Sequence, residues 1–201
     1  DNGQRIRARY VVSAVPFRVL REIEITPALQ GEQADAVRRM PYHNQSQVWL
    51  RVTRPDWEDD GIEASMWSDG PVTLIRQQIE HDGSRELLSA LAAGPKAVQL
   101  DAMPAADRAR FVIEYLQRIR PSMVGKLQYL GVHSWQQVPL IRGCSHQYVP
   151  GKVVAWSHAM IQPHQRLHFA GEHARRLEVG MEAAMESGER AALEVLERLS
   201  A

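Results

Sequence analysis

The sequence predicts an α+β fold, in which a mixed β-sheet is accompanied by helices. Short apolar segments separated by turn-forming clusters run through the first half of the chain, as in a β-meander. Two long segments in the second half, 104–120 and 181–199, have the apolar spacing of helices. With 201 residues, 44% of them hydrophobic and 24% charged, the chain can bury a sizeable core.

The first elements are a strand, a short helix and a second strand. Residues 10–15 are almost wholly apolar and end at Pro16, which is typical of a strand that enters a core. Pro27 and Gly31 bracket the region before a helix predicted over 32–39. The next strand is predicted over 47–52, because Arg54-Pro55-Asp56 follows it as a turn.

Turn clusters then divide the chain into further strands. Asp59-Asp60-Gly61 and Ser68-Asp69-Gly70-Pro71 are rich in the residues that favour turns. The predicted strands between and after these clusters are Ala64–Trp67, Val72–Ile79 and Glu86–Leu91. Pro104 opens the long helix predicted over 104–120, and Pro121 ends it.

The last third of the chain combines two strands with a long helix. A strand is predicted over 129–135, a loop rich in Gly and Pro over 138–151, and a short strand over 167–170. A C-terminal helix of about five turns follows, because its apolar residues recur at helical spacing. Those residues are Met181, Ala184, Met185, Gly188, Ala192, Val195 and Leu199.

Composition excludes several classes of protein. The 24 basic and 24 acidic residues balance, so no basic face for nucleic acid is indicated. No apolar run reaches the ~20 residues that span a bilayer, so no membrane partner is expected. The single cysteine, Cys144, excludes an intramolecular disulfide, and the 8 histidines show no zinc spacing, so no metal is predicted. The expected compartment is the cytoplasm, with any export signal lying upstream of these residues.

The start of the chain has the pattern of half a hairpin. Asn2-Gly3 is a strong hairpin-turn dipeptide, and an alternating, then apolar, segment follows it. A hairpin needs two strands, and only Asp1 precedes the turn. The alternatives are a truncated or processed chain and a frayed terminus that happens to contain Asn-Gly; we expect the former.

The strand at 167–170 and the helix after it form a candidate ligand site. The strand ends in Gly171-Glu172, and the helix begins near Gly180 and Met181. In open α/β sheets, ligands bind at the edge where strand ends and helix N-termini meet. The carboxylate of Glu172 could accept a hydrogen bond from a sugar or ribityl hydroxyl, while helix N–H groups face an electronegative group. The alternative is that Glu172 is a solvated loop acid and Met181 and Met185 are core residues.

The end of the chain resembles a known family. Leu167-His168-Phe169-Ala170-Gly171-Glu172-His173, with Gly180-Met181-Glu182-Ala183-Ala184-Met185-Glu186-Ser187-Gly188-Glu189-Arg190-Ala191-Ala192, resembles the C-terminal flavin-binding signature of the flavin-containing amine oxidases. Val11–Phe17 with Pro27-Ala28-Leu29 resembles the strand that leads into the substrate domain of that family. Trp135, Pro139, Gly143, Tyr148, Pro150 and Gly151 resemble the loop over the flavin.

The resemblance implies the C-terminal half of an FAD-dependent monoamine or L-amino-acid oxidase. It implies a substrate domain at 27–148, framed by a strand segment at 1–26 and a C-terminal FAD-binding segment at 149–201. These two segments belong to a Rossmann-like FAD domain whose N-terminal βαβ part, with its Gly-x-Gly-x-x-Gly turn, is missing. No Gly-x-Gly occurs in the 201 residues, so this chain alone is expected to hold FAD poorly and to need that other half.

The resemblance also implies roles for individual residues. The family's flavin-facing lysine falls on Gln47, which can hold a water but cannot act as an amine base. The two tyrosines that flank the substrate amine in monoamine oxidases fall on Ser145 and Gly180. Other side chains that could line the substrate are His146, Trp135 and Tyr148. The residues implied for the cofactor are Gly171, Glu172, Gly180, Met181, Trp135 and Cys144.

Cys144 has two interpretations. It matches the monoamine oxidase cysteine that forms a thioether to the flavin 8α-methyl, or it is a small buried residue without that bond.

Two classes of function follow. In the first, the protein oxidises a primary or secondary amine, or an amino acid, to an imine and passes the electrons to O2; a homodimer is possible. In the second, it is a catalytically silent flavoprotein subunit or scaffold, as the loss of the lysine and of the tyrosine pair suggests. A flavin-dependent desaturase of a non-amine substrate lies between them. The length of the motif favours the first class.

Overall fold

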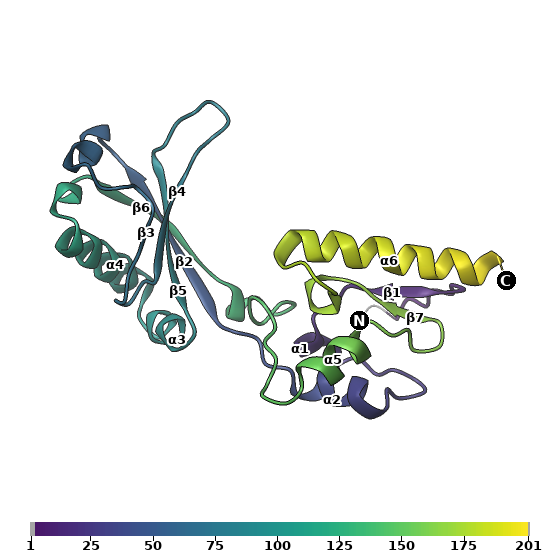
Figure 1. The fold of residues 1–201 in the computed structure, drawn as a ribbon. Coiled ribbons are helices and arrows are strands. Elements are labelled where there is room, and N and C mark those ends of the chain that lie inside the picture. The colour runs from purple at the N-terminus through teal and green to yellow at the C-terminus, as the bar shows by residue number, and fades with distance from the viewer. Residues whose placement is uncertain (1–2, 201) are drawn as a thin grey trace. The chain divides into compact units, whose positions relative to one another are not determined.

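The computed structural model describes residues 3–200, with the side chains of all of these except 55–57. The chain forms two compact units, one built from 1–42 and 139–201 and the other from 43–138 (Figure 1). The second unit is shorter at both ends than the substrate domain predicted at 27–148. Asn2, half of the predicted turn dipeptide, lies outside the described residues, while Gly3 has the positive φ of 71° that such a turn requires.

The first unit contains a two-stranded parallel sheet. Strand β1 (Val11–Ser13) pairs with β7 (Leu167–Phe169), so that Val12 lies beside His168. Helix α6 (Gly180–Ser200) follows β7 and runs beside this pair (Figure 1). The strand predicted at 167–170 and the C-terminal helix are therefore confirmed, whereas only three residues of the strand predicted at 10–15 are extended in the sheet.

Three further helices complete the first unit: α1 (Phe17–Leu20), α2 (Gly31–Arg39) and α5 (Val153–Met160). They share a core in which Phe17, Trp156 and Phe169 are fully buried. The helix predicted at 32–39 is confirmed as α2. The sequence pattern did not reveal α1 and α5, because 4 and 8 residues give too few turns to establish a helical period.

The second unit is built on a five-stranded antiparallel sheet with the order β3-β4-β5-β2-β6. Its strands are β2 (Gln45–Val52), β3 (Met66–Trp67), β4 (Leu74–Gln78), β5 (Leu87–Ala93) and β6 (Leu127–Ser134). The predicted meander is present in β3, β4 and β5, and β2 lies between β5 and β6. The strand predicted at 129–135 begins two residues earlier, and Trp135 stands outside it in a short 3-10 turn.

One face of this sheet carries the core of the second unit. Along β2, Ser46, Val48, Leu50 and Val52 are buried in alternation, as the two-residue period of a half-buried strand requires. Helices α3 (Pro95–Asp101) and α4 (Ala105–Ile119) contribute Leu100, Val112 and Leu116 to the same core. The helix predicted at 104–120 is confirmed as α4, and the short α3 was missed.

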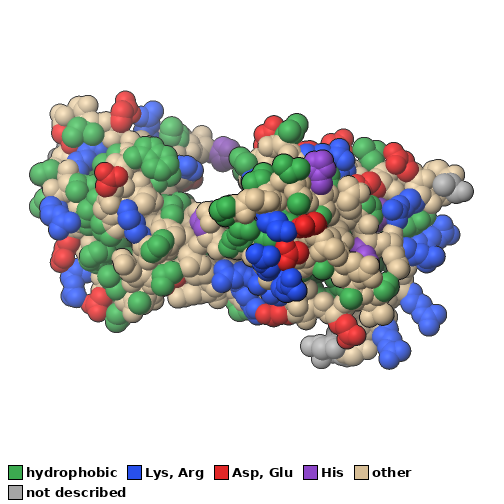
Figure 2. Space-filling view, turned by 60° about the horizontal axis from the view of Figure 1, so that its bottom comes forward, with side chains coloured by type: hydrophobic (Ala, Val, Ile, Leu, Met, Phe, Trp, Pro, Cys, Tyr) green, Lys and Arg blue, Asp and Glu red, His purple; other side chains and the backbone are tan. Residues whose placement is uncertain are grey.

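The surface agrees with the composition. Both acidic and basic side chains are exposed on the face shown in Figure 2, as the equal charge totals require. Among residues 3–200, no helix combines the length and the apolar character needed to cross a membrane.

Candidate functional site

The connection from β7 to α6 begins at a glycine that no other residue could replace without strain. Gly171 has a φ of 101°, and a Cβ atom there would lie 2.8 Å from Cε1 of His173. The N–H of Gly171 donates to Oγ of Ser187 (2.8 Å), which ties the end of the strand to the second turn of α6. The backbone at Gly171 is thus fixed where the sequence predicts a ligand site.

Glu172 is held by two partners from different parts of the first unit. Its Oε2 lies 3.0 Å from Nδ1 of His146, and its Oε1 accepts from Nη1 of Arg175 (2.8 Å). The alternative that Glu172 is a solvated loop acid is wrong, because its side chain is only 21% exposed and paired. Each carboxylate oxygen has a second lone pair, so the group can still accept from a ligand hydroxyl.

The surroundings of Glu172 favour its ionised form. Burial alone raises the pKa of Glu172, but the hydrogen bond with His146 and the charges of His146 and Arg175 lower it further than burial raises it. Burial lowers the pKa of the neighbouring His173 to about 4, with the charge of His146 acting in the same direction. His173 is therefore neutral at pH 7, beside an ionised carboxylate.

Two histidine nitrogens beside Glu172 have no hydrogen-bond partner. Nε2 of His146 and Nε2 of His173 are buried, and neither atom is bonded to another described residue. The ring of His146 is bracketed by Tyr148 (centroids 5.2 Å apart) and Tyr42 (6.4 Å). Buried polar atoms without partners are rare in folded proteins, and they often mark functional positions.

Cys144 and Ser145 precede this cluster in the chain. The sulfur of Cys144 lies 3.8 Å from Oγ of Ser145. Burial raises the pKa of the Cys144 thiol, and the charge of Glu172 acts in the same direction. The thiol form is therefore favoured over the thiolate, which is the reactive form of cysteine.

The N-terminus of α6 is open to solvent. Gly180 has a φ of 66°, and Met181 is 83% exposed. The alternative that Met181 and Met185 are core residues is wrong for the described chain, and most of the apolar residues whose spacing predicted the helix are exposed. The buried face of α6 instead consists of Ala183, Ser187, Arg190 and Ala191. The spacing of the apolar residues therefore predicted the helix correctly, but those residues lie mainly on the side of α6 that does not pack against the rest of the first unit.

Gln47 and Trp135 belong to the second unit, whereas the other predicted site residues belong to the first. Gln47 lies in the middle of β2, between Leu91 of β5 and His133 of β6. The ring of Trp135 meets the ring of His133 edge-on, with centroids 4.3 Å apart. Sequence reasoning missed His133, since only strand pairing places it beside Gln47.

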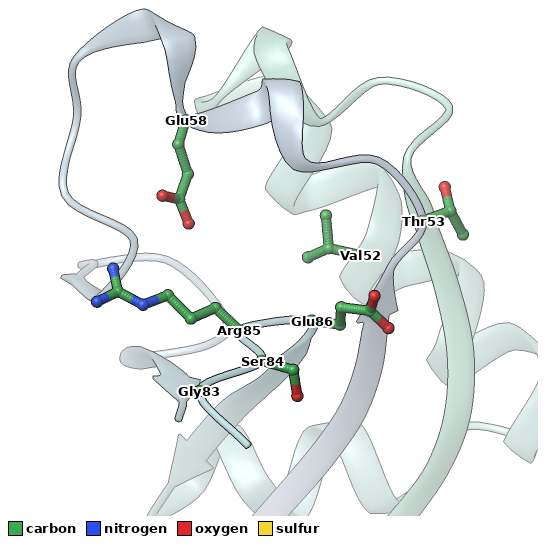
Figure 3. Close-up of a pocket in the computed structure, with 7 residues that line it drawn as sticks. All are labelled: Val52, Thr53, Glu58, Gly83, Ser84, Arg85 and Glu86. Carbon is green, nitrogen blue, oxygen red and sulfur yellow. The ribbon is translucent and has the colours of Figure 1, made fainter. Parts of the chain in front are cut away.

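Metal sites and cavities are the other kinds of place at which the described residues could bind a ligand. No group of three or more His, Cys, Asp or Glu residues among the described positions could hold a metal ion. A cavity of about 330 Å³ lies in the second unit between the end of β2, the 3-10 turn at 55–60 and the β4–β5 connection (Figure 3). Glu58 and Arg85 point toward this space, which contains none of the predicted site residues.

The sequence matches the family described as "Flavin containing amine oxidoreductase" over residues 1–196. It is 27% identical to a probable flavin-containing monoamine oxidase A from Dictyostelium discoideum, covering 99% of this chain and 44% of that protein. It is 26% identical to L-amino acid oxidase Bs29 from Bothriechis schlegelii, covering 94% of this chain and 39% of that protein. The chain thus spans less than half the length of these relatives.

Solved structures share the fold. Cyclohexylamine oxidase from Brevibacterium oxydans IH-35A superposes on 100% of this chain with a TM-score of 0.88 and 22% identity, and the match covers 46% of that chain. A putrescine oxidase bound to putrescine superposes with a TM-score of 0.80 and 18% identity, over 94% of this chain and 42% of that one. At these identities the similarity establishes the fold.

Proposed function

The chain belongs to the flavin-containing amine oxidoreductase family, and on this basis we propose that it forms part of an FAD-dependent enzyme that oxidises amines. The observation that carries the proposal is the family match over residues 1–196, which includes every residue of the candidate site. The geometry that supports it is the ionised, half-buried Glu172 at the end of β7, on a backbone tied to α6.

The residues of the first unit fit the ribityl and ring end of FAD. Glu172 retains lone pairs for ribityl hydroxyl groups, and the first turn of α6 has N–H groups without partners inside the helix. The buried Nε2 atoms of His146 and His173 are further polar atoms that lack a partner. Gly171 keeps the backbone free of a side chain at this edge.

Each of these groups has a distinct task in the proposed enzyme. FAD, when bound, supplies the redox chemistry by accepting two electrons and a proton from the amine and passing the electrons to O2. Glu172 would orient the cofactor by accepting from ribityl hydroxyl groups, while Arg175 and His146 keep the carboxylate charged and in place. The N-terminus of α6 would stabilise negative charge that develops on the flavin ring.

Further parts of the proposal rest on the family resemblance. The segments 1–26 and 149–201 are assigned to a Rossmann-like FAD domain, and the parallel β1–β7 pair supports this assignment. Parallel sheets are normally covered on both faces, so more strands and helices are expected around this pair. The exposed apolar residues of α6, such as Met181 and Met185, are available for such packing.

The proposed substrate is an amine or an amino acid, and both classes are represented among the relatives. We propose, on the family resemblance, that Gln47 holds a water near the flavin. A second candidate, a catalytically silent flavoprotein subunit, is favoured by one observation: Gln47 cannot accept a proton as an amine would.

A substrate panel tests the proposal against this alternative. The flavin-loaded protein that contains this chain is incubated in air with cyclohexylamine, putrescine and a set of L-amino acids. Hydrogen peroxide and the carbonyl product of imine hydrolysis should form together, in equal amounts, with at least one of these compounds. Flavin binding without any such product would support the silent subunit, and an unsaturated product without ammonia release would support the desaturase.

A further inference from the structure

The face of the five-stranded sheet opposite the core carries a row of side chains across all five strands. Strand pairing places these residues side by side on one face, because their neighbours in the chain, such as Val48 and Ala90, are buried in the core. The row consists of Trp67, Leu74, Leu91, Gln47 and His133, in that order from β3 to β6. It is apolar at β3, β4 and β5 and polar at β2 and β6.

On the core face of the sheet, a buried carboxylate lies behind the polar end of this row, which consists of Gln47 and His133. Asp101, at the end of α3, accepts from Oγ of Ser46 (2.7 Å) and from Oγ of Ser134, which are paired residues on β2 and β6. Gln136 also donates to Asp101, and its Oε1 accepts the N–H of Gln45 (2.8 Å). The ends of β2 and β6 are thereby joined through one carboxylate.

The same carboxylate faces Arg108 of α4, with Nη1 3.6 Å from Oδ1 and both side chains 10% exposed. A buried ion pair of this kind often adds little to stability, so the stability of the fold does not by itself explain it. The residues that donate to the Asp101 carboxylate, Ser46, Ser134 and Gln136, are adjacent in the chain to Gln47, His133 and Trp135. The arrangement holds these three residues in a fixed geometry on the open face.

His133 has an unused polar atom in this fixed setting. Its Nε2 is buried and has no hydrogen-bond partner among the described residues. Trp135 packs edge-on against its ring, and Gln47 lies directly across the strand pair. A neutral imidazole has one nitrogen that donates and one that accepts, so a ligand N–H group brought to Nε2 could find an acceptor there.

We propose that His133 binds the amino group of the substrate through Nε2 and takes a proton from its ammonium form. This inference rests on the proposed function. The N–H bond of the ammonium ion breaks, its electron pair stays on the substrate nitrogen, and a new N–H bond forms at Nε2; the proton later leaves to solvent. Gln47 offers a carbonyl acceptor beside this nitrogen, and Leu91 and Leu74 continue the row as an apolar surface for the substrate's carbon skeleton.

Few charged groups share this face with His133. Arg76 of β4 and Arg51 of β2 lie further along the same face, and both are exposed. Nε2 of His43 lies 3.3 Å from Oε1 of Gln45, at the start of β2. The carboxylate of Asp101 lies on the opposite face. One nitrogen of a neutral imidazole can accept a proton, so His133 has the chemistry needed to take this one.

The direct test is an NMR titration that does not depend on turnover. The flavin-loaded protein is labelled with 15N-histidine and its flavin is reduced with dithionite, so that no electrons can pass from the amine; cyclohexylammonium chloride is then added without oxygen. The Nε2 resonance of His133 should move with saturation, and that signal should be absent in His133→Phe and retained in His81→Phe, which changes an exposed turn residue. Cyclohexyltrimethylammonium, which has no N–H group, should not reproduce the shift. An unmoved resonance, or an equal shift with both probes, would overturn the proposal.

Steady-state kinetics give a second readout. His133→Phe should lower kcat/KM about 100-fold, and the acidic limb that His133 contributes to the pH profile of kcat/KM should disappear. His133→Gln, which retains a hydrogen-bond acceptor, should lose the same limb with a smaller rise in KM. His81→Gln should leave both quantities unchanged. An acidic limb that persists in His133→Phe contradicts the proposal.

The two proposals fail in different ways. If amines reduce the flavin in the wild-type protein but the His133 signal and pH profile do not behave as described, only the role of His133 is wrong. If no amine reduces the flavin, the proposed function itself is wrong.

Discussion

At the residue scale, Glu172 shows how one carboxylate is prepared for a ligand. His146 and Arg175 each form a hydrogen bond with one oxygen of the Glu172 carboxylate. Together they lower the pKa of Glu172 by more than burial raises it. An ionised acceptor makes hydrogen bonds of about 1.5–3 kcal/mol, against about 1 kcal/mol for a neutral one. If Glu172 binds the cofactor as proposed, this difference in hydrogen-bond strength should be measurable as a difference in FAD affinity.

We therefore expect Glu172→Gln to weaken FAD binding by about tenfold, since a tenfold change corresponds to about 1.4 kcal/mol. Glu178→Gln is the matched control, because Glu178 is exposed and lies in the same β7–α6 connection. The dissociation constants can be measured by FAD titration of the apoprotein. Equal affinities of the two variants would remove Glu172 from the site.

The same carboxylate predicts a pH dependence of stability. The pKa of Glu172 is lower in the folded chain than its ordinary value, so its contribution to stability is present above the unfolded pKa. The contribution is lost as the pH falls through the folded pKa. In urea unfolding without cofactor, wild type should exceed Glu172→Gln in unfolding free energy at pH 7, and this advantage should shrink in acid. An advantage that grows on acidification would contradict the assigned direction.

Cys144 leads to a prediction about how the flavin is attached. The thiolate is the nucleophilic form of cysteine, and burial raises the pKa of this thiol. We expect no thioether: acid precipitation of the loaded protein should release all the flavin into the supernatant. The mass of the chain should then equal that of Cys144→Ala plus the difference of one sulfur atom. A flavin adduct on the wild-type chain would show that the thiol reacts.

At the element scale, α6 is fastened to β7 by a charged network. Arg190 donates to the carbonyl oxygen of Phe169 (2.6 Å) and to Oε1 of Glu194 (2.7 Å), while Oε2 of Glu194 lies 2.7 Å from Nδ1 of His168. Burial raises the pKa of Glu194, but the bonds with His168 and Arg190 lower it by more. The buried side of α6 thus combines small residues with this network.

Removing the charge of Glu194 should loosen this attachment. Glu194→Gln leaves the guanidinium of Arg190, only 8% exposed, without its carboxylate, so we expect a loss of about 1–3 kcal/mol in unfolding free energy. Glu197→Gln, on the exposed side of the same helix, should change it by less than about 0.5 kcal/mol. Chemical denaturation of both variants gives the comparison. Similar losses in the two would show that the network does not hold the helix.

Local pattern predicted the longer elements well. Helix α4 lies between Pro104 and Pro121, as the sequence indicates, and α2 begins at Gly31, one residue before its predicted start. The strands of the meander were recognised from their turns, although β3 retains only two residues of the predicted 64–67. The buried face of α6 could not be predicted, because Arg190 becomes a buried residue only through carbonyl groups that the fold brings to it.

In the candidate site too, some residues could be predicted from the local sequence and others could not. Gly171 and Glu172 could be identified from the end of a strand before a helix, which is a local signal. The partners of Glu172 could not, because His146 approaches it from a loop 26 residues earlier in the chain. His133 is placed beside Gln47 only by the pairing of β2 with β6.

At the scale of the whole molecule, the two units differ in the size of the sheet on which each is built. The second unit has a five-stranded sheet, two helices on one face and its own core. Among the described residues, the first unit has only a two-stranded parallel pair, in which Val11 and Val12 of β1 are about half exposed. The chain matches 39–46% of the length of its relatives. We expect the first unit to gain most in stability from packing against further parts of the proposed FAD domain.

The central claim, that this chain belongs to an enzyme in which amines reduce a bound flavin, is tested by one anaerobic measurement. The flavin-loaded protein is mixed with cyclohexylamine, putrescine or an L-amino acid in a stopped-flow instrument without oxygen, and its visible flavin absorbance is recorded. We predict that at least one of these compounds bleaches the flavin at a rate that saturates with concentration, and that air restores the colour. A flavin that stays oxidised with every amine and amino acid, yet is bleached by dithionite, would contradict the claim.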